Sequence, residues 1–344
     1  MGAQRIGDRI GDLRGRALRD LRISLTDRCN LRCVYCMPRE LFGPDHVFLP
    51  AERLLTFDQI ERVARVAVSG GVTKLRLTGG EPLLRPGIAD LVSRLSQLRR
   101  ADSGAVDLAL TTNGTALARL GAPLREAGLD RVTVSLDSLD DESFARISDT
   151  RMPLTRVLDG IEAARSAGLP VKVNTVVRRG LNDGEIEAIA EHFRGTGVTV
   201  RFIEYMDVGT TNGWRLDEVV PSAEIVERIG RRHPLVPVAE RGSATASRFR
   251  YADGSGEIGV ISSVTEAFCG SCTRARLSAD GRLFTCLFAS DGVDLRHAAT
   301  ESDKAVADVL FGAWRTRDDR YSELRGADTQ GRAPARVEMS FIGG

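Results

Sequence analysis

The chain has 344 residues, of which 42% are hydrophobic, with 48 basic and 47 acidic side chains. A formal net charge of +1 excludes binding to nucleic acid through a uniformly basic surface, so any anion site must be local. No apolar run of about 18 residues predicts a membrane span, and the first residues lack the apolar core of a secretion signal. Six cysteines in such a chain predict a reducing, cytoplasmic location, where thiols bind metals more often than they form disulfides.

The order of predicted elements along the chain indicates a parallel sheet. Residues 1–20 carry mixed charge and little apolar surface, which predicts a flexible, loosely held tail. Over residues 21–210, short aliphatic runs alternate with helical patterns, which predicts six β-then-α units. The predicted strands are Leu21–Thr26, Lys74–Thr78, Val106–Thr112, Arg131–Asp137, Val171–Val177 and Thr199–Tyr205.

Polar and aliphatic residues alternate along several of these strands. In the first strand, for example, Leu21 and Ile23 lie opposite Arg22 and Ser24, because successive side chains point to opposite faces. If helices cover the aliphatic face, the polar face lines the inside of a curved sheet. The alternation therefore favours an α/β fold, a partial (β/α)6 TIM-type barrel with a polar lumen. The alternative, a doubly wound open sheet, would need apolar residues on both faces.

The pattern changes after about residue 210, where Asn212-Gly213, Asp253-Gly254 and Asp280-Gly281 signal turns. We therefore expect residues 211–344 to form a smaller α+β region that closes the barrel. Its expected elements are a hairpin of Arg248–Tyr251 with Gly259–Ser262, a hairpin of Thr273–Ser278 with Arg282–Cys286, and a helix around Asp303–Arg315.

Three cysteines with CxxxCxxC spacing, Cys29, Cys33 and Cys36, follow the first strand directly. This position is the carboxyl end of the strands, where barrel folds place their active sites. Three thiolates are one ligand short of a closed tetrahedral zinc site, and the loop holds no further cysteine or histidine. The spacing favours an iron–sulfur cluster with one open iron over a structural zinc loop or buried thiols.

A second trio consists of Cys269, Cys272 and Cys286. With His297 it could form a Cys3His zinc site. The spacing alone leaves a zinc site and a three-cysteine cluster equally open.

Five cations share the strand phases that face the predicted lumen. They are Arg22, Arg76, Lys172, Arg274 and Arg276. Each one alone could be a solvated surface charge. Together they would repel one another unless an anion is bound, and arginine binds phosphate through two parallel hydrogen bonds. The set therefore favours a ligand with several phosphates.

The first trio, with Tyr35 directly before its third cysteine, resembles the signature of radical S-adenosylmethionine enzymes. The resemblance implies a partial (β/α)6 barrel and a [4Fe–4S] cluster whose open iron chelates S-adenosylmethionine. Thr78-Gly79-Gly80-Glu81-Pro82 resembles the superfamily segment that contacts the methionine amino group. The S-adenosylmethionine contacts implied by the resemblance are Tyr35, Gly80, Ser135 and Met206.

The segment FCGSCTRARLSADGRLFTCLF is similar to the C-terminal motif of the GTP 3′,8-cyclase family, which starts molybdenum cofactor biosynthesis. RFIEYMDVG at residues 201–209 and the terminal MSFIGG extend the similarity. The resemblance implies a second [4Fe–4S] cluster on the second trio, with the guanine of GTP at its open iron. The implied GTP contacts are Arg22, Arg76, Thr111, Lys172, Arg274, Ala275 and Arg276, and the implied catalytic residues are Arg274, Arg276, Gly343 and Gly344.

The activity implied by this resemblance is conversion of GTP to 3′,8-cyclo-7,8-dihydro-GTP through a 5′-deoxyadenosyl radical. It also implies an external one-electron donor similar to flavodoxin or ferredoxin, product transfer to a cyclic pyranopterin monophosphate synthase, and a homodimer. No membrane or specific nucleic-acid partner is expected. Two alternatives stay open: a radical S-adenosylmethionine enzyme that modifies a peptide, and a non-enzymatic iron–sulfur or zinc scaffold.

Overall fold

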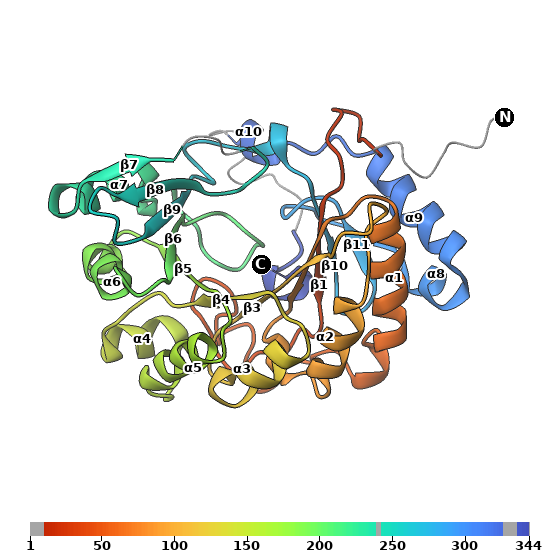
Figure 1. Cartoon of the computed structure of the whole chain (residues 1–344), viewed down its shortest axis with the longest axis horizontal. Coiled ribbons are helices and arrows are strands. Elements are labelled where there is room, and N and C mark those ends of the chain that lie inside the picture. The colour runs from red at the N-terminus through yellow and green to blue at the C-terminus, as the bar shows by residue number, and fades with distance from the viewer. Residues whose placement is uncertain (1–9, 239–241, 326–335, 344) are drawn as a thin grey trace.

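The computed structural model describes residues 10–238, 242–325 and 336–343 (Figure 1). Its central feature is a run of six strands, each paired in parallel with the next along the chain. These strands are β1 (Asp20–Ser24), β2 (Lys74–Thr78), β3 (Asp107–Thr112), β4 (Arg131–Ser135), β5 (Val171–Val177) and β6 (Thr199–Glu204). The six predicted strands are thus confirmed, with ends that shift by two residues at most.

Helices follow these strands and lie on the outer side of the curved sheet (Figure 1). They are α1 (Phe57–Ser69), α2 (Ile88–Ser96), α3 (Leu117–Glu126), α4 (Asp141–Ser148), α5 (Thr155–Ser166) and α6 (Ile186–Phe193). The first of them begins after Thr56, whose side chain forms a capping box with Gln59, and ends at Gly70. The aliphatic face of the strands packs against the helices and forms the core, in which Leu21, for example, is fully buried. The partial-barrel prediction is confirmed, and the polar faces of the strands are left for the interior.

The C-terminal part of the chain extends the same sheet at both ends, giving the order β12-β11-β10-β1-β2-β3-β4-β5-β6-β9-β8-β7 within the described residues. The added strands are β7 (Leu235–Pro237), β8 (Ser247–Tyr251), β9 (Glu257–Ile261), β10 (Arg274–Leu277), β11 (Arg282–Phe284) and β12 (Val293–Asp294). Strand β10 pairs in parallel with β1, which places Arg276 beside Arg22, and β9 pairs in parallel with β6. The sheet therefore runs across residue 210, and a domain boundary at this point stays a prediction.

Shorter elements complete the described fold. The remaining helices are α7 (Ser222–Arg232), α8 (Arg296–Glu301), α9 (Asp303–Arg315), α10 (Tyr321–Leu324) and α11 (Met339–Ile342). Single 3-10 turns lie at Ala51–Arg53, Pro82–Leu84, Asp183–Glu185, Leu216–Glu218 and Cys269–Ser271. None of the helices in the described ranges is long and apolar enough to cross a bilayer.

The segment before β1 is part of the packed structure. Gly11 and Ala17 form a β-bridge, and the side chains of Asp12 and Arg16 are buried and joined by an ion pair of 2.6 Å. The indole Nε1 of Trp314 donates a hydrogen bond of 2.9 Å to the carbonyl of Arg16. Residues 11–20 thus have polar groups with partners far along the chain, whereas residues 1–9 lie outside the described residues. A flexible tail over residues 1–20 stays a prediction.

Candidate active site

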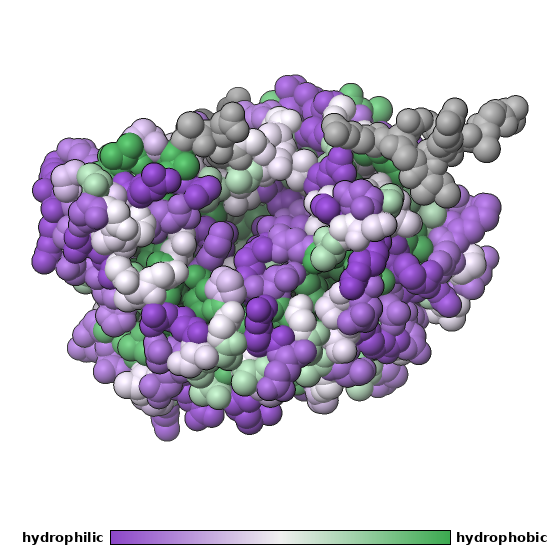
Figure 2. Space-filling view, viewed as in Figure 1, coloured by the Kyte–Doolittle hydropathy of each residue, from purple (hydrophilic) through white to green (hydrophobic). Residues whose placement is uncertain are grey.

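A cavity of about 420 Å³ lies inside the curved sheet, a size typical of small-molecule sites. Its walls come from β1, β2, β3, β5, β6, β10 and the segments around them. Figure 2 shows a hollow on this face of the molecule with hydrophilic residues inside it. The polar strand faces thus line an internal cavity, as the alternation along the strands predicts.

Four of the five predicted cations line this cavity, namely Arg22, Arg76, Arg274 and Arg276. The Nε atoms of Arg22, Arg76 and Arg276 are buried and have no hydrogen-bond partner among the described residues. Burial, which disfavours the charged form, lowers the pKa of Arg22 to about 9 and that of Arg76 to about 10, and neighbouring arginines act in the same direction. Unpartnered buried donors together with mutual repulsion are relieved if an anion occupies the cavity.

Sequence analysis missed four further cations in the wall, of which Lys74 and Arg201 stand on the predicted strands; the other two are Arg19 and Arg317. The Nζ atom of Lys74 lies 3.3 Å from Asp20 Oδ2, and burial lowers the pKa of Lys74 to about 8. The Nη2 atom of Arg201 donates to Thr133 Oγ1 at 3.2 Å, whereas its buried Nε has no partner within the described ranges. Lys74 and Arg201 stand on the polar phase of predicted strands, so the same alternation could have identified them.

Three other predicted GTP contacts fall in different places. Thr111 lines the cavity, and its Oγ1 accepts a hydrogen bond of 2.9 Å from Arg76 Nη1. Lys172 lies on β5 next to Thr133 but outside the cavity wall, and burial and the nearby Arg201 lower its pKa to about 8. The side chain of Ala275 is buried in the hydrophobic core, on the opposite face of β10 from the two arginines that flank it.

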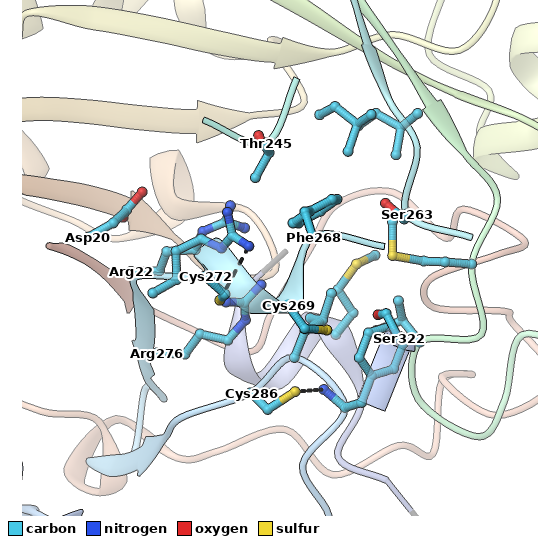
Figure 3. A pocket seen from close by; sticks show the side chains of 18 of the residues that line it. Asp20, Arg22, Thr245, Ser263, Phe268, Cys269, Cys272, Arg276, Cys286 and Ser322 are labelled. Atoms are coloured by element: carbon cyan, nitrogen blue, oxygen red, sulfur yellow. Dashed lines mark hydrogen bonds between the residues drawn. The ribbon is translucent and has the colours of Figure 1, made fainter. Parts of the chain in front are cut away.

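All three cysteines of the second trio line the cavity, beside Arg22 and Arg276 (Figure 3). Guanidinium groups of Arg274 and Arg317 each donate to Cys272 Sγ at 3.3 Å, and the Phe288 amide donates to Cys286 Sγ at 3.5 Å. Such N–H···S contacts are typical of cysteines that hold iron–sulfur clusters. The chemistry of this donor set, three free cysteines with N–H donors to two of them, fits an iron–sulfur cluster at the cavity wall.

The electrostatic surroundings of this trio are uneven. Burial raises the pKa of the Cys286 thiol to about 11. At Cys272 burial acts in the same direction, but the guanidinium groups of Arg274 and Arg317 outweigh it and lower the pKa to about 7. His297, the possible fourth zinc ligand, is outside the cavity wall: its side chain is 90% exposed and lies 4.0 Å from Glu301. The position of His297 argues against a Cys3His zinc site.

The first trio lies in the loop after β1. The Leu31 amide donates to Cys29 Sγ at 3.4 Å and the Asn113 side chain at 3.8 Å. Burial raises the pKa of Cys29 to about 11 and that of Cys33 and Cys36 still further above its usual range. The three free cysteines of this loop would be the protein ligands of an iron–sulfur cluster. Across the described ranges, no group of three His, Cys, Asp or Glu side chains is placed so that it could hold one metal ion.

Two of the predicted S-adenosylmethionine contacts, Tyr35 and Met206, line the cavity. The hydroxyl of Tyr35 donates to Asp137 Oδ2 at 2.6 Å, which fixes the ring at the end of the first trio. Ser135 ends β4 and is half-buried, outside the cavity wall. The structure thus brings part of the predicted cofactor set next to the predicted GTP contacts.

The loop after β2 packs directly against the loop that carries the first trio. The Gly80 amide donates to the Thr26 carbonyl at 2.7 Å, and a Cβ at position 80 would lie 2.4 Å from the Arg28 carbonyl oxygen. Only glycine fits this close approach. The buried carboxylate of Glu81 accepts hydrogen bonds from the Thr112 hydroxyl and the Asn113 amide, both at 2.7 Å, which ties the loop to β3.

The C-terminal residues reach the same end of the barrel. Met339, in α11, lines the cavity, and Figure 1 shows the described C-terminal end inside the curve of the sheet. Gly343 has a φ of +75°, and a Cβ there would collide with Thr78 Oγ1 at the end of β2. Gly343 is therefore close to the predicted site, while Gly344 lies outside the described residues.

Comparisons with known proteins agree with this geometry. Residues 23–193 match the family model of the Radical SAM superfamily, and residues 198–323 match Molybdenum Cofactor Synthesis C. The chain is 52% identical over 362 aligned residues to GTP 3′,8-cyclase of Acidothermus cellulolyticus, with 97% of this chain and 99% of that relative covered. It is 43% identical over 342 residues to GTP 3′,8-cyclase of Staphylococcus aureus strain JH9, covering 98% and 99%. The chain belongs to the GTP 3′,8-cyclase family.

Among solved structures, Streptococcus suis SuiB bound to S-adenosylmethionine matches with a TM-score of 0.59 at 15% identity. The match covers 90% of this chain and 68% of that chain, and it supports the fold. The predicted family, its fold and its enzyme class are confirmed. The match to the Radical SAM superfamily supports the prediction of S-adenosylmethionine and an iron–sulfur cluster.

Proposed function

We propose that this chain converts GTP to 3′,8-cyclo-7,8-dihydro-GTP, the first step of molybdenum cofactor biosynthesis. The observation that carries the proposal is the set of buried arginines with unpartnered Nε atoms in the described cavity, next to three free cysteines. A triphosphate supplies the negative charge that these guanidinium groups need. A peptide substrate would leave most of the cations unpaired, which disfavours the peptide-modifying alternative.

The proposed residues for the cofactor are those around the first trio. Cys29, Cys33 and Cys36 would hold a [4Fe–4S] cluster, and with S-adenosylmethionine bound there the site would supply a 5′-deoxyadenosyl radical. The absence of a side chain at Gly80 lets the backbone approach S-adenosylmethionine closely. The other proposed contacts are Tyr35, Ser135 and Met206.

The proposed residues for GTP lie on the polar faces of the strands. Cys269, Cys272 and Cys286 would hold a second [4Fe–4S] cluster with guanine at its open iron. The proposed contacts of the triphosphate and ribose are Arg22, Lys74, Arg76, Thr111, Lys172, Arg201, Arg274, Ala275 (through its backbone) and Arg276. Held at both ends, the nucleotide would keep ribose C3′ and guanine C8 within reacting distance. Gly343 and Gly344 would complete the site, where exclusion of water protects a reactive radical.

The remaining parts of the proposal concern partners and organisation. We assign residues 21–210 mainly to S-adenosylmethionine and residues 211–344 mainly to the second trio and the tail. An external one-electron donor similar to flavodoxin or ferredoxin would reduce the first cluster. A cyclic pyranopterin monophosphate synthase would take the product, and the enzyme would act as a cytoplasmic homodimer.

The test is turnover by anaerobically reconstituted protein with dithionite, S-adenosylmethionine and GTP. The hydrogen lost from C3′ is replaced by one electron and one proton, so the cyclic product is an isomer of GTP. We expect 5′-deoxyadenosine and this isomer to form together with GTP and not with ATP. If S-adenosylmethionine is cleaved equally with and without GTP, the cyclase proposal is wrong; if it is not cleaved at all, the non-enzymatic scaffold remains.

A further inference from the structure

One buried carboxylate, that of Asp207 in the loop after β6, gathers donors from two separate parts of the C-terminal segment. The Tyr321 hydroxyl donates to Asp207 Oδ2 at 2.6 Å. Arg336 Nη1 donates to the same oxygen at 2.9 Å, and Arg325 Nη2 forms an ion pair of 2.7 Å with Oδ1. The side chains of Asp207, Arg325 and Arg336 are only 14%, 8% and 9% exposed. Three partners on one carboxylate at this burial make a fixed junction.

The two arginines stand on either side of residues 326–335 in the sequence. The chain therefore leaves the carboxylate at Arg325 and meets it again at Arg336. Both guanidinium groups also lie over the Tyr321 ring, at 5.5 Å for Arg325 and 4.3 Å for Arg336. Without a negative charge at Asp207, two buried cations near the same ring would repel each other.

The residues after Arg336 continue along the same loop. The Glu338 carboxylate accepts hydrogen bonds of 3.0 Å from both the amide and the hydroxyl of Thr210, and one of 2.9 Å from the Thr211 hydroxyl. Helix α11 follows and brings Gly343 against Thr78. The loop 205–212 is thus the support on which the described end of the chain reaches the cavity.

We propose that Asp207 is a positioning residue that anchors the C-terminal segment and so holds Gly343 at the end of β2, beside the cavity. Asp207 itself is outside the cavity wall, whereas its chain neighbours Met206 and Val208 are part of it. The junction thereby connects the loop that carries the proposed S-adenosylmethionine contact Met206 with the tail. The anchoring is independent of the reaction, and only its effect on turnover rests on the proposed function.

The test measures how fast carboxypeptidase removes the C-terminal residues from the reconstituted, folded enzyme, followed by intact mass. In Asp207→Asn we expect trimming at least about tenfold faster than in the wild type, because loss of the charge raises the population of the open tail. Asp207→Glu, which keeps the charge, is expected to restore most of the protection. Asp217→Asn is the matched control, since Asp217 is exposed and pairs only with Arg215 in the described structure.

A second variant separates anchoring from general unfolding. Arg336→Gln removes one donor and leaves Asp207 paired with Arg325 and Tyr321, so the fold is kept even if Asp207→Asn is unstable. We expect faster trimming here too, with an unchanged GTP dissociation constant and a lower kcat. Tails as protected as in the wild type in the folded variants would overturn the proposal. A wild type without GTP-dependent turnover would instead overturn the proposed function and leave the trimming result valid.

Discussion

The two cysteine trios differ in their electrostatic surroundings, most clearly between Cys29 and Cys272. In the first, neutral donors contact Cys29, namely the Leu31 amide and the Asn113 side chain. The second has guanidinium donors, with Arg274 and Arg317 both contacting Cys272. The pKa directions follow this difference. At Cys29 burial raises the pKa, and the negative charge of Glu81 raises it further. At Cys272 burial also acts to raise the pKa, but the two arginines outweigh it and lower the pKa to about 7.

This contrast indicates how the two trios can serve two tasks: the second lines the cavity described above, whereas Cys29, Cys33 and Cys36 lie outside its wall. At the first trio, burial raises the pKa of Cys29 more than the nearby Arg32 lowers it, so the charge of three thiolates would be balanced mainly by the metal bound there. At the second trio, the arginines balance thiolate charge and also face the cavity, where an anionic substrate can use them. The first trio is therefore suited to cofactor chemistry and the second to holding a nucleotide.

The largest expected effect separates the trios directly. We expect Cys29→Ala to abolish cleavage of S-adenosylmethionine, because its cluster then lacks a ligand, while Cys272→Ala keeps this cleavage and loses cyclisation. Each variant should retain about four irons per chain, against about eight in the wild type, if each trio holds a [4Fe–4S] cluster. Iron analysis and 5′-deoxyadenosine formation check both, each variant being the other's control. Equal loss of cleavage in the two variants would contradict the division of tasks.

The next effect concerns the cations on the second trio's side. Arg22→Ala is expected to weaken GTP binding roughly tenfold to a hundredfold, the range for a hydrogen bond to a charged group. Anaerobic calorimetry measures this, with Lys304→Ala as the control, since Lys304 is exposed and bound to Asp308. The first cluster's iron should stay in place in both variants. GTP binding unchanged in Arg22→Ala would remove this arginine from the phosphate site.

A smaller effect, on a redox potential, is expected from replacing Arg317, whose guanidinium group donates a hydrogen bond to Cys272 of the second trio. Its positive charge stabilises the more negative, reduced state of a cluster. Arg317→Gln should therefore make the potential of the second cluster more negative by about 59 mV, a tenfold change for one electron. Spectroscopic redox titration measures it, and Arg315→Gln, at an exposed position two residues earlier, is the control. If both variants titrate like the wild type, the hydrogen bond has no influence on the cluster.

The smallest expected effect is none at all. His297→Ala should leave metal content and turnover unchanged, because the imidazole is exposed and outside the cavity wall. Metal analysis for iron and zinc on the purified variant tests this. Loss of one metal ion per chain would restore the Cys3His zinc site.

The sequence predicted those parts of the site that depend on local strand geometry. Alternation along single strands correctly placed Arg22, Arg76 and Arg276 toward the interior, because the period of two is set by the backbone itself. The same rule shows that Ala275 faces the core, yet the family resemblance included it among the GTP contacts. Arg201 was missed although its strand carried the same pattern.

Contacts between distant segments could not be predicted. Arg317 and Asp12 pair at 3.3 Å across 305 positions, and Arg336 and Asp207 pair across 129. A single sequence shows each of these charges as an ordinary surface residue, since its partner is chosen by the tertiary fold. For the same reason the sequence predicts a loosely held tail over residues 1–20, although Asp12 is buried in the structure.

The measurement that tests the division between the trios most directly is the effect of ligands on the spectrum of each cluster alone. Reduced Cys29→Ala protein would contain only the second cluster, and reduced Cys272→Ala protein only the first. We predict that GTP changes the electron paramagnetic resonance spectrum of Cys29→Ala but not that of Cys272→Ala. S-adenosylmethionine is expected to change the spectrum of Cys272→Ala but not that of Cys29→Ala. A GTP response from the first cluster, or none from the second, would contradict the account.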